Sequence, residues 1–469
     1  MPGHKSLIRL QAAKQEYDWG RQGSSSLAAR LGVCAFGHGF QPDEKKCYAE
    51  IWMGTHPNGP ANIFDTPSIS LLDLIRSNPK YYLGEKLLTK WPATIHVPYL
   101  FKVLSIRKAL PLQAHPDKSL AEQLQQRDPN NFVDANHKPE IAVAIGEPLC
   151  QTRAKHGEEG KTKLGGPKVE DADTAFTGFV GFRPLEEIKT YLEHVRELTS
   201  AIGDPDVITR FTQNPSKQTL KHVYGKLLKR GIEARNEVAA AIEKLADRIN
   251  QQAAYDLGFP DSETLARLVV KVNAQYPGDV GVLATTFFMN LVKLRKGEGI
   301  YIGADEVHAY LEGDIIECMA TSDNVVNAAF DSPESLAPQV DTFIDMLSYT
   351  ARQASHWALP AQGYQHSRRH RTVKYDPPLE EFTVLGTILS AANAKEETLD
   401  AVEGPTIGIV TRGRLKVSSK PNTGGAQDSL ELDEGCVVFV PPGHEIQVEV
   451  SGGCGPEGAG EMWWSLWDA

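Results

Sequence analysis

The 469-residue sequence contains no apolar run near the roughly 18 residues that cross a membrane. It also lacks an excess of positive charge, since 60 acidic residues against 49 lysines and arginines give a formal net charge of −11. Nucleic acids and anionic membranes are bound by basic surfaces. We therefore expect no nucleic-acid partner and no membrane partner. A phosphorylated ligand would need a locally basic pocket.

Cysteine pairs with metal-binding or redox spacing are missing as well. The six cysteines are scattered and form no C-x-x-C motif, which is typical of reduced thiols in the cytosol. We interpret all six as partly buried, unreactive thiols. The N-terminal stretch MPGHKSLIRLQAAKQ has no apolar segment of the kind that directs secretion. We expect a cytoplasmic protein that is a monomer.

The hydrophobic pattern divides the chain, which is too long for one compact domain. Residues 1–184 are rich in short apolar runs bounded by Gly, Pro, Asn and Asp, which predicts strands. Residues 185–278 carry apolar side chains at i, i+3, i+4 and i+7, which predicts amphipathic helices. Strand character returns at Val282. We therefore predict a mainly β fold with a helical insertion, and two further β segments at 279–330 and 331–469.

Two shorter stretches stand out against this pattern. The Gly-, Lys- and Asp-rich segment 157–174 has little apolar content and predicts a surface loop, within an insertion at 149–178. The C-terminal EMWWSLWDA is rich in tryptophan, which we interpret as core packing.

One pattern occurs twice. GIYIGADEVH (299–308) and GCVVFVPPGH (435–444) both run from a glycine through an apolar strand and a turn to a histidine nine positions later. A strand of this kind is a familiar part of small β-barrels of the cupin, or jelly-roll, type. Two related β-units are the interpretation, one on each side of the helices along the chain.

Candidate metal ligands lie in three separate stretches. LQAHPDK places Gln113 and His115 two residues apart, so that in a strand both face one side. NHKPE adds Glu140, and DEVHAY adds His308. One amide oxygen, one carboxylate and two imidazoles suit Zn, Fe, Mn or Ni better than Ca. Spacing alone leaves open that these are hydrogen-bonded structural residues.

Long motifs in a fixed order give a more specific signal. They include QEYDWGRQGSSSLAARL (15–31), YAEIWMGTHPNGP (48–60), PYLFKVLSIRKALPLQAHPDKSLAEQL (98–124) and GIYIGADEVHAYLEGDIIECMATSDNVV (299–326). In these stretches, and over most of its length, the chain resembles the type I mannose-6-phosphate isomerases, most closely the fungal ones. These enzymes interconvert mannose 6-phosphate and fructose 6-phosphate, a step toward GDP-mannose and mannosylation.

The resemblance implies a fold and a set of site residues. The expected fold is a metal-binding cupin domain, an α-helical domain and a second cupin-like domain without metal, in which His444 is structural. One zinc ion per chain would be bound by Gln113, His115, Glu140 and His308. Lys138 and Glu317 would be catalytic, with Glu317 a candidate base. The substrate, a phosphorylated hexose, would lie against Asp18, Trp19, Lys102 and Tyr310.

The chain departs from the family pattern on the cationic side of the pocket. Pro111 stands where the family has a serine, and it offers neither a hydroxyl nor a backbone N–H. Asn327 stands where the family has an arginine, so the string reads DNVVNAA. The usual lysine shortly afterwards is absent, because residues 330–334 read Phe-Asp-Ser-Pro-Glu around Pro333. Removing one positioned charge commonly costs about 3 kcal/mol of transition-state stabilisation.

Two hypotheses from different classes follow. In the first, the protein is an active isomerase in which Lys102, Lys138, Arg107 or Lys108 supplies the missing charge. In the second, it is a catalytically impaired or repurposed paralogue that binds a metal and a sugar-type ligand. A different cupin enzyme such as an oxygenase fits less well, because such sites use three protein ligands and Gln113 would be a fourth.

Overall fold

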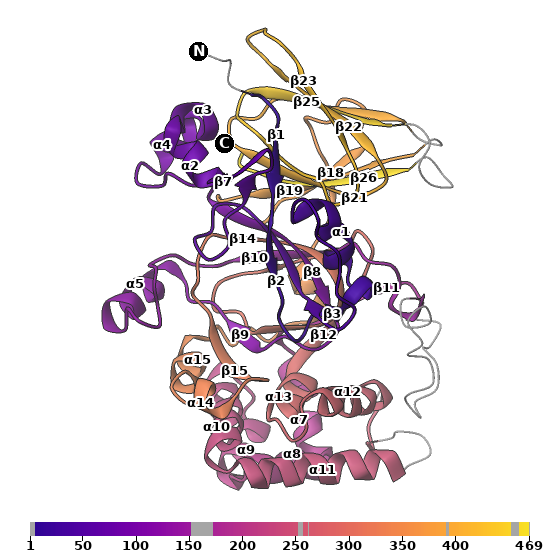
Figure 1. The fold of residues 1–469 in the computed structure, drawn as a ribbon. Helices are drawn as coiled ribbons and strands as arrows, with labels where there is room; N and C mark the ends of the chain where they lie inside the picture. The colour runs from indigo at the N-terminus through magenta and orange to yellow at the C-terminus, as the bar shows by residue number, and fades with distance from the viewer. Residues whose placement is uncertain are drawn as a thin grey trace.

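The computed structural model describes residues 5–151, 172–251, 257–260, 262–390, 394–451 and 459–468. Figure 1 shows three layers along the long axis: helices at one end, a large sheet in the middle, and a second β-layer that contains the C-terminus. None of the helices in the described ranges is both long enough and apolar enough to cross a membrane. The predicted mainly β fold with a helical insertion is confirmed.

The middle layer is an eleven-stranded sheet, which we call the central sheet. Its strands are β2 (Ala13–Gln15), β5 (Glu50–Met53), β8 (Tyr99–Ile106), β9 (Leu112–Ala114), β10 (Glu140–Ala144), β11 (Thr174–Phe182), β12 (Met289–Arg295), β13 (Gly299–Ile302), β14 (His308–Ala320), β15 (Val326–Ala329) and β16 (Ala358–Leu359). A two-stranded ribbon, β3 (Arg21–Gln22) and β4 (Cys47–Tyr48), lies outside it.

Strand β14 organises the central sheet. It is buried along its whole length, as expected for a strand with both faces covered. Its first half pairs with β11 and its second half with β8 and β10. The change of partner occurs at Gly313, where φ is +128° and a Cβ would lie 2.5 Å from the carbonyl oxygen of Ala175. Glycine is required there, because its φ is in the left-handed half of the map and a side chain would strike the neighbouring strand.

The helical layer lies at the far end of the molecule in Figure 1. Its helices are α7 (Leu185–His194), α8 (Arg196–Ile202), α9 (Pro205–Gln213), α10 (Lys217–Glu233), α11 (Arg235–Gln251), α12 (Ser262–Gln275) and α13 (Gly281–Phe288). The predicted return of strand character at Val282 is wrong, because GVLATTFF forms α13 and the next strand begins at Met289. All eight residues of α13 are buried, so this helix has no polar face to give a helical period.

The third layer packs two sheets against each other, with a shared apolar core between them. The nine-stranded sheet contains β1 (Ile8–Gln11), β6 (Asn62–Ile63), β7 (Thr66–Ser70), β17 (Gln362–Gly363), β18 (Thr372–Tyr375), β19 (Thr383–Leu389), β21 (Thr406–Arg412), β24 (Val437–Val440) and β26 (Gly460–Leu466). The four-stranded sheet contains β20 (Glu396–Leu399), β22 (Leu415–Pro421), β23 (Asp428–Leu432) and β25 (His444–Val450).

The remaining helices connect the layers. They are α1 (Leu27–Ala35), α2 (Leu71–Ser77), α3 (Pro79–Leu83), α4 (Glu85–Lys90), α5 (Lys118–Arg127), α14 (Pro333–Leu336) and α15 (Val340–Met346), with 3-10 turns at Gly23–Ser25 and Ala354–Trp357.

Sequential boundaries at 184, 278 and 330 do not describe how the layers are built. The N-terminal strand β1 pairs with β24 of the third layer, so residues 1–184 are divided between two layers. Phe343 and Ile344 of α15 belong to the helical core, although both follow residue 331. Contacts between segments that are distant in the sequence decide which layer each segment joins. The hydrophobic pattern along the chain does not reveal these contacts.

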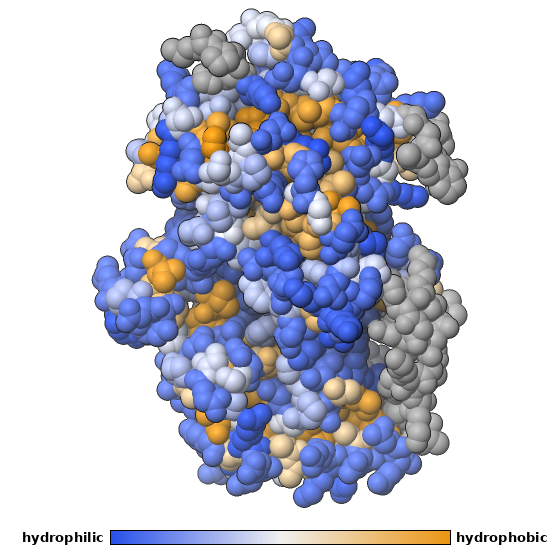
Figure 2. Space-filling model, viewed as in Figure 1, coloured by the Kyte–Doolittle hydropathy of each residue, from blue (hydrophilic) through white to orange (hydrophobic). Residues whose placement is uncertain are grey.

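Two predictions about individual stretches have different outcomes. Trp463, Trp464 and Trp467 are almost fully buried, which confirms the core interpretation of the tryptophan-rich end. In Figure 2 the apolar surface on the visible face is broken up by polar residues. The predicted surface loop lies largely outside the described residues, and its last residue, Thr174, begins β11.

We expect Gly435→Ala to lower the free energy of unfolding by about 3 kcal/mol. Gly435 has φ of +86°, and a Cβ would lie 1.8 Å from the Leu31 carbonyl oxygen in α1. The matched control is Gly443→Ala, where φ is +75° but nothing lies within 4 Å, so only the backbone cost of about 1 kcal/mol applies. Urea unfolding of the two variants measures the difference. Equal stabilities would contradict the tight packing of α1 on Gly435.

Candidate metal centre

Two histidines and a glutamate converge where three strands of the central sheet begin or end. Glu140 is the first residue of β10, His308 is the first residue of β14, and His115 follows directly after β9. The Nε2 atom of His115 lies 3.5 Å from Glu140 Oε2, and that of His308 lies 3.3 Å from Glu140 Oε1. All three side chains are almost fully buried. We call these three residues the triad.

Backbone carbonyls fix the orientation of both imidazole rings. Nδ1 of His115 is 2.8 Å from the Asn324 carbonyl oxygen, and Nδ1 of His308 is 3.0 Å from the Glu306 carbonyl oxygen. Because a carbonyl only accepts, each Nδ1 carries a proton, and in the neutral ring Nε2 is left with the lone pair that a metal binds. Burial, followed by the charge of Lys138, lowers the pKa of His115 to about 4, so this ring is neutral at pH 7.

The triad has the properties of a transition-metal site. Both Nε2 atoms are buried without a hydrogen-bond partner, and a bound cation would satisfy them. One ligand atom from each of the three residues lies within 4.8 Å of the others, a spacing that a single transition-metal ion can bridge. Tyr310 donates a 2.6 Å hydrogen bond to Glu140 Oε1, an outer contact of the kind that orients a ligating carboxylate.

Gln113 is placed beside the triad by its strand register. It is the middle residue of β9, and its Cα pairs with that of His308 on one side and that of Asn327 on the other. The amide is therefore on the strand that leads directly to His115. The structure thus brings the Gln113 position together with the three residues of the triad.

A buried charge cluster lies on the neighbouring strands of the same sheet. Lys102 in β8 pairs directly across from Glu317 in β14, and its Nζ is 2.8 Å from Glu317 Oε1 and 3.6 Å from Glu50 Oε2. Burial opposes the charge of Lys102, but Glu317 and Glu50 outweigh it and raise the pKa of the ammonium group. Burial raises the pKa of Glu317 to about 7, with Lys102 acting in the opposite direction. A carboxyl group poised near neutral pH is suited to moving protons.

Lys138 belongs to the same electrostatic cluster. Burial and the charge of Lys102 lower the pKa of Lys138, while Glu140 and Glu317 act to raise it. Two lysines and three carboxylates, Glu50, Glu140 and Glu317, therefore share this region. The predicted catalytic pair, Lys138 and Glu317, is brought together with the triad.

Other predicted substrate residues lie apart from the triad. The side chain of Asp18 is 81% exposed and pairs with Lys108, 3.2 Å away. Lys108 also lies over the ring of Tyr276, and Arg107 donates to the Asp18 carbonyl oxygen. Trp19 is buried in the same apolar cluster as Tyr310, so it contributes to packing around this tyrosine.

The positions that depart from the family pattern lie on either side of β9. Pro111 directly precedes β9 and is partly buried. Asn327 in β15 donates its N–H to Gln339, and its Oδ1 is buried without a hydrogen-bond partner. Asp331 and Pro333 line a small pocket together with Arg235 of α11, so the acidic segment faces the helical layer.

Several residues near the cluster escaped the sequence analysis. Glu50 and Trp52 alternate along β5, and the Trp52 indole donates to Glu50. A lone acid inside the apolar run EIWM is the signal that would have found Glu50. Nε2 of His56 lies 3.2 Å from Asp323 Oδ1, and the nearby charge of Lys138 helps to lower the pKa of Asp323.

The repeated Gly-to-His pattern forms the same local structure twice. His308 opens β14 and His444 opens β25, each after a strand and a turn. Nδ1 of each ring contacts the carbonyl two residues earlier, that of Glu306 or Pro442. His444, however, lies against the ring of Tyr81 rather than beside an acid or a second histidine. Only the first copy belongs to a ligand cluster.

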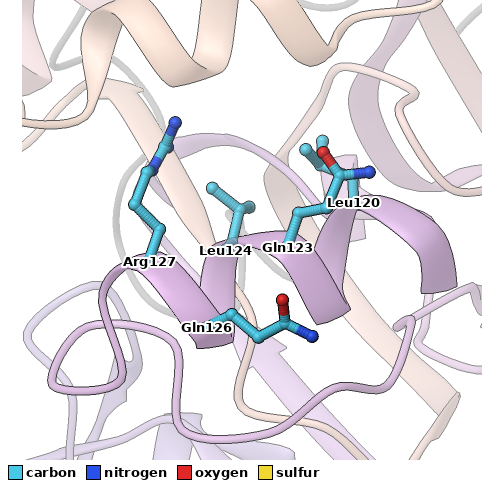
Figure 3. Close-up of a pocket in the computed structure, with 5 residues that line it drawn as sticks. All are labelled: Leu120, Gln123, Leu124, Gln126 and Arg127. Carbon is cyan, nitrogen blue, oxygen red and sulfur yellow. The ribbon is translucent and has the colours of Figure 1, made fainter.

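Helix α5 begins three residues after His115 and borders a surface hollow. Figure 3 shows Leu120, Leu124 and Arg127 projecting from one side of the helix. Its lining combines apolar side chains, two glutamines and one arginine, a set without metal-type ligands. The lining of this hollow therefore offers none of the histidine or carboxylate ligands that form the triad.

The third layer braces the segment that carries Lys138. Glu381, just before β19, is buried and lies 2.7 Å from His137 Nε2 and 3.1 Å from Lys118 Nζ. Burial acts to raise the pKa of Glu381, but the contacts with His137 and Lys118 outweigh burial and lower this pKa to about 2. One carboxylate thus connects the C-terminal layer to both α5 and the strand of Glu140.

Family models match three parts of the chain. The catalytic domain of type I phosphomannose isomerase matches residues 7–154, the helical insertion domain matches 193–289, and the C-terminal domain matches 373–420. Among curated relatives, the mannose-6-phosphate isomerase of Candida albicans is 35% identical over 95% of each chain. That of Emericella nidulans is 37% identical over 95% of this chain and 93% of its own.

Solved structures share the fold. A mannose 6-phosphate isomerase from Salmonella typhimurium, bound to fructose 6-phosphate and zinc, aligns over 99% of this chain and 100% of its own. The TM-score is 0.72 and the sequence identity is 21%. A mannose 6-phosphate isomerase bound with zinc and yttrium gives the same values.

We expect Glu381→Gln to lower the free energy of unfolding at pH 7 by about 1–2 kcal/mol, because it leaves His137 and Lys118 without their carboxylate. A depressed carboxyl pKa stabilises the fold above the ordinary pKa, and this contribution disappears as the pH falls toward 2. The difference in the free energy of unfolding between variant and parent should therefore become smaller as the pH falls from 5 to 3. Urea unfolding at several pH values measures it.

The matched control is the adjacent Glu380→Gln. Glu380 is largely exposed and pairs with Lys90, so its replacement should change the unfolding free energy by less than about 0.5 kcal/mol at every pH. A constant gap for Glu381→Gln across the pH range would count against the ion-pair interpretation.

Proposed function

Because the chain belongs to the type I phosphomannose isomerases, we propose that it interconverts mannose 6-phosphate and fructose 6-phosphate with one bound zinc ion. The observation that carries this is the buried triad with its two unpartnered Nε2 atoms, next to the Lys102–Glu317 pair. We propose further that the reaction supplies GDP-mannose synthesis and mannosylation. The cytoplasmic location and the monomeric state stay predictions.

The proposed ligands are Gln113, His115, Glu140 and His308. Zinc bound there would act as a Lewis acid that polarises an oxygen of the sugar. The chain's own contribution is to fix both imidazole tautomers through Asn324 and Glu306 and to orient Glu140 through Tyr310.

Proton transfer between C1 and C2 is assigned to the charge cluster. Glu317, with a pKa of about 7, takes the proton from one carbon and returns it to the other. Lys102 holds Glu317 in place and stabilises negative charge that develops on the substrate oxygens. Lys138, whose pKa is lowered, is the candidate for protonating a sugar oxygen.

The remaining contacts are assigned around this centre. Tyr310 acts through Glu140 as a positioning residue, and Trp19 packs behind it. Asp18 and Lys108 form an exposed pair, so they could contact only the outer end of a hexose phosphate.

A second candidate function rests on Asn327. Its buried, unpartnered Oδ1 accepts hydrogen bonds, whereas the family's arginine at this position donates them. The uncharged amide can hydrogen-bond a sugar hydroxyl, and it supplies no positive charge to a phosphate. The alternative is therefore a paralogue that binds zinc and an uncharged sugar-type ligand and turns over mannose 6-phosphate poorly.

Metal binding is tested with histidine variants. We expect the parent to contain about one zinc per chain after dialysis, and His308→Ala to contain less than about a tenth of that, because a ligand is lost. His444→Ala is the matched control, since this residue ends the same motif without a ligand cluster. Elemental analysis by mass spectrometry measures the content. Less than about half-occupancy in the parent counts against both functions.

Turnover is tested by coupling fructose 6-phosphate formation to NADPH production. The proposed isomerase should turn over mannose 6-phosphate, and Pro111→Ser with Asn327→Arg should raise kcat/KM about 10²-fold by restoring the missing cation. The control is Lys108→Arg, which keeps the surface charge. A parent without turnover that gains it in the double variant would establish the paralogue; fast turnover in the parent would exclude it.

A further inference from the structure

Two of the cysteines meet although they are far apart in the sequence. Cys34 lies in the last turn of α1, and Cys436 directly precedes β24. Gly435, which precedes Cys436, lies against the carbonyl of Leu31, one helical turn before Cys34, and each thiol shifts the pKa of the other. Cys436 is buried in the core of the third layer, whereas Cys34 is half-buried and packs against that core. One thiol is therefore accessible and the other is not.

The backbone around Cys436 is hydrogen-bonded to the neighbouring strand and lies directly against α1. The turn before β24 is fixed by hydrogen bonds from Gly435 N to Val410 O and from Val410 N to Cys436 O. Gly435 abuts the carbonyl of Leu31 so closely that it has no room for a Cβ. The α1 helix and the β24 turn are thus in close backbone contact within one helical turn of Cys34, a proximity that a crosslink between the two cysteines requires.

The charges around the pair make the two thiols unequal. The hydrogen bond with Cys436 lowers the pKa of Cys34 to about 7, against burial; Arg9 also lowers it, while Asp433 and Glu434 act to raise it. The hydrogen bond with Cys34 and burial raise the pKa of Cys436. Arg9 contacts Cys436 Sγ at 3.4 Å. A low-pKa, accessible thiol beside a second thiol is the arrangement of an attacking and a resolving cysteine.

We propose that Cys34 and Cys436 form a reversible disulfide in response to hydrogen peroxide. The Cys34 sulfur attacks one peroxide oxygen, the O–O bond breaks, and hydroxide leaves and is protonated to water. The resulting sulfenic acid is attacked by the Cys436 sulfur; the S–S bond forms, the S–O bond breaks, and the Cys436 proton leaves with the second water. Two thiols are oxidised and one peroxide is reduced to two waters.

The disulfide would connect two layers covalently. At its other end α1 is anchored to the central sheet, because Leu27 N donates to Ser105 Oγ in β8, the strand that carries Lys102. Crosslinking Cys34 to Cys436 therefore ties the charge-cluster sheet to the C-terminal layer through one helix. Because the bridge closes a very long loop, the oxidised protein should unfold at a temperature higher by about 2–4 °C or more.

The experiment treats the full-length protein with hydrogen peroxide, removes the excess with catalase, and alkylates free thiols in denaturant. Mass spectrometry of an unreduced digest should show the Cys34 and Cys436 peptides linked in more than about half of the molecules, and dithiothreitol should separate them. The rise in unfolding temperature should be reversed by the same treatment.

Cys34→Ser should abolish both the linked peptide and the temperature shift, while its circular dichroism confirms that it folds. Cys47→Ser is the matched control, because Cys47 is also a half-buried free thiol, and it should leave both signals intact. The proposal is overturned if Cys34 in the parent stays a free thiol, stops at sulfinic acid or links to another cysteine. It is also overturned if the peroxide-induced rise in unfolding temperature persists in Cys34→Ser.

Discussion

The position of Glu140 between the imidazoles of His115 and His308 is the constraint on which the site depends. A buried carboxylate is costly unless charge or hydrogen bonds compensate it. Tyr310 supplies one hydrogen bond, but each histidine proton points away from Glu140 toward a backbone carbonyl. A bound cation would compensate the carboxylate and satisfy both buried Nε2 atoms.

The charge cluster beside the triad depends on the same cation. Three carboxylates outnumber the two lysines, Lys102 and Lys138, so the region is formally negative without a metal and positive with a divalent one. A phosphorylated sugar would be repelled in the first state and attracted in the second. Asn327, at the position where the resemblance implies an arginine, is uncharged, so a bound metal and Lys102 would have to supply positive charge on this side.

The sequence predicted the helices whose apolar residues recur at a helical spacing. The prediction failed for a helix that is buried on all sides, because such a helix has no alternation of apolar and polar residues. The amphipathic helices between residues 185 and 275 formed as expected, because each has a polar face. Helix α13 was missed because it is buried on all sides. Glu50 and the contact between Cys34 and Cys436 were missed for another reason, since neither has a partner near it in the chain.

The two Gly-to-His motifs separate what the sequence determined from what the tertiary structure decided. The local pattern fixed a strand, a turn and a histidine whose Nδ1 faces a preceding carbonyl, and it did so for both His308 and His444. Only the packing of β9, β10 and β14 placed Glu140 and His115 beside the first of these rings. Local sequence sets backbone hydrogen bonds over a few residues, whereas a metal site needs side chains that three strands bring together.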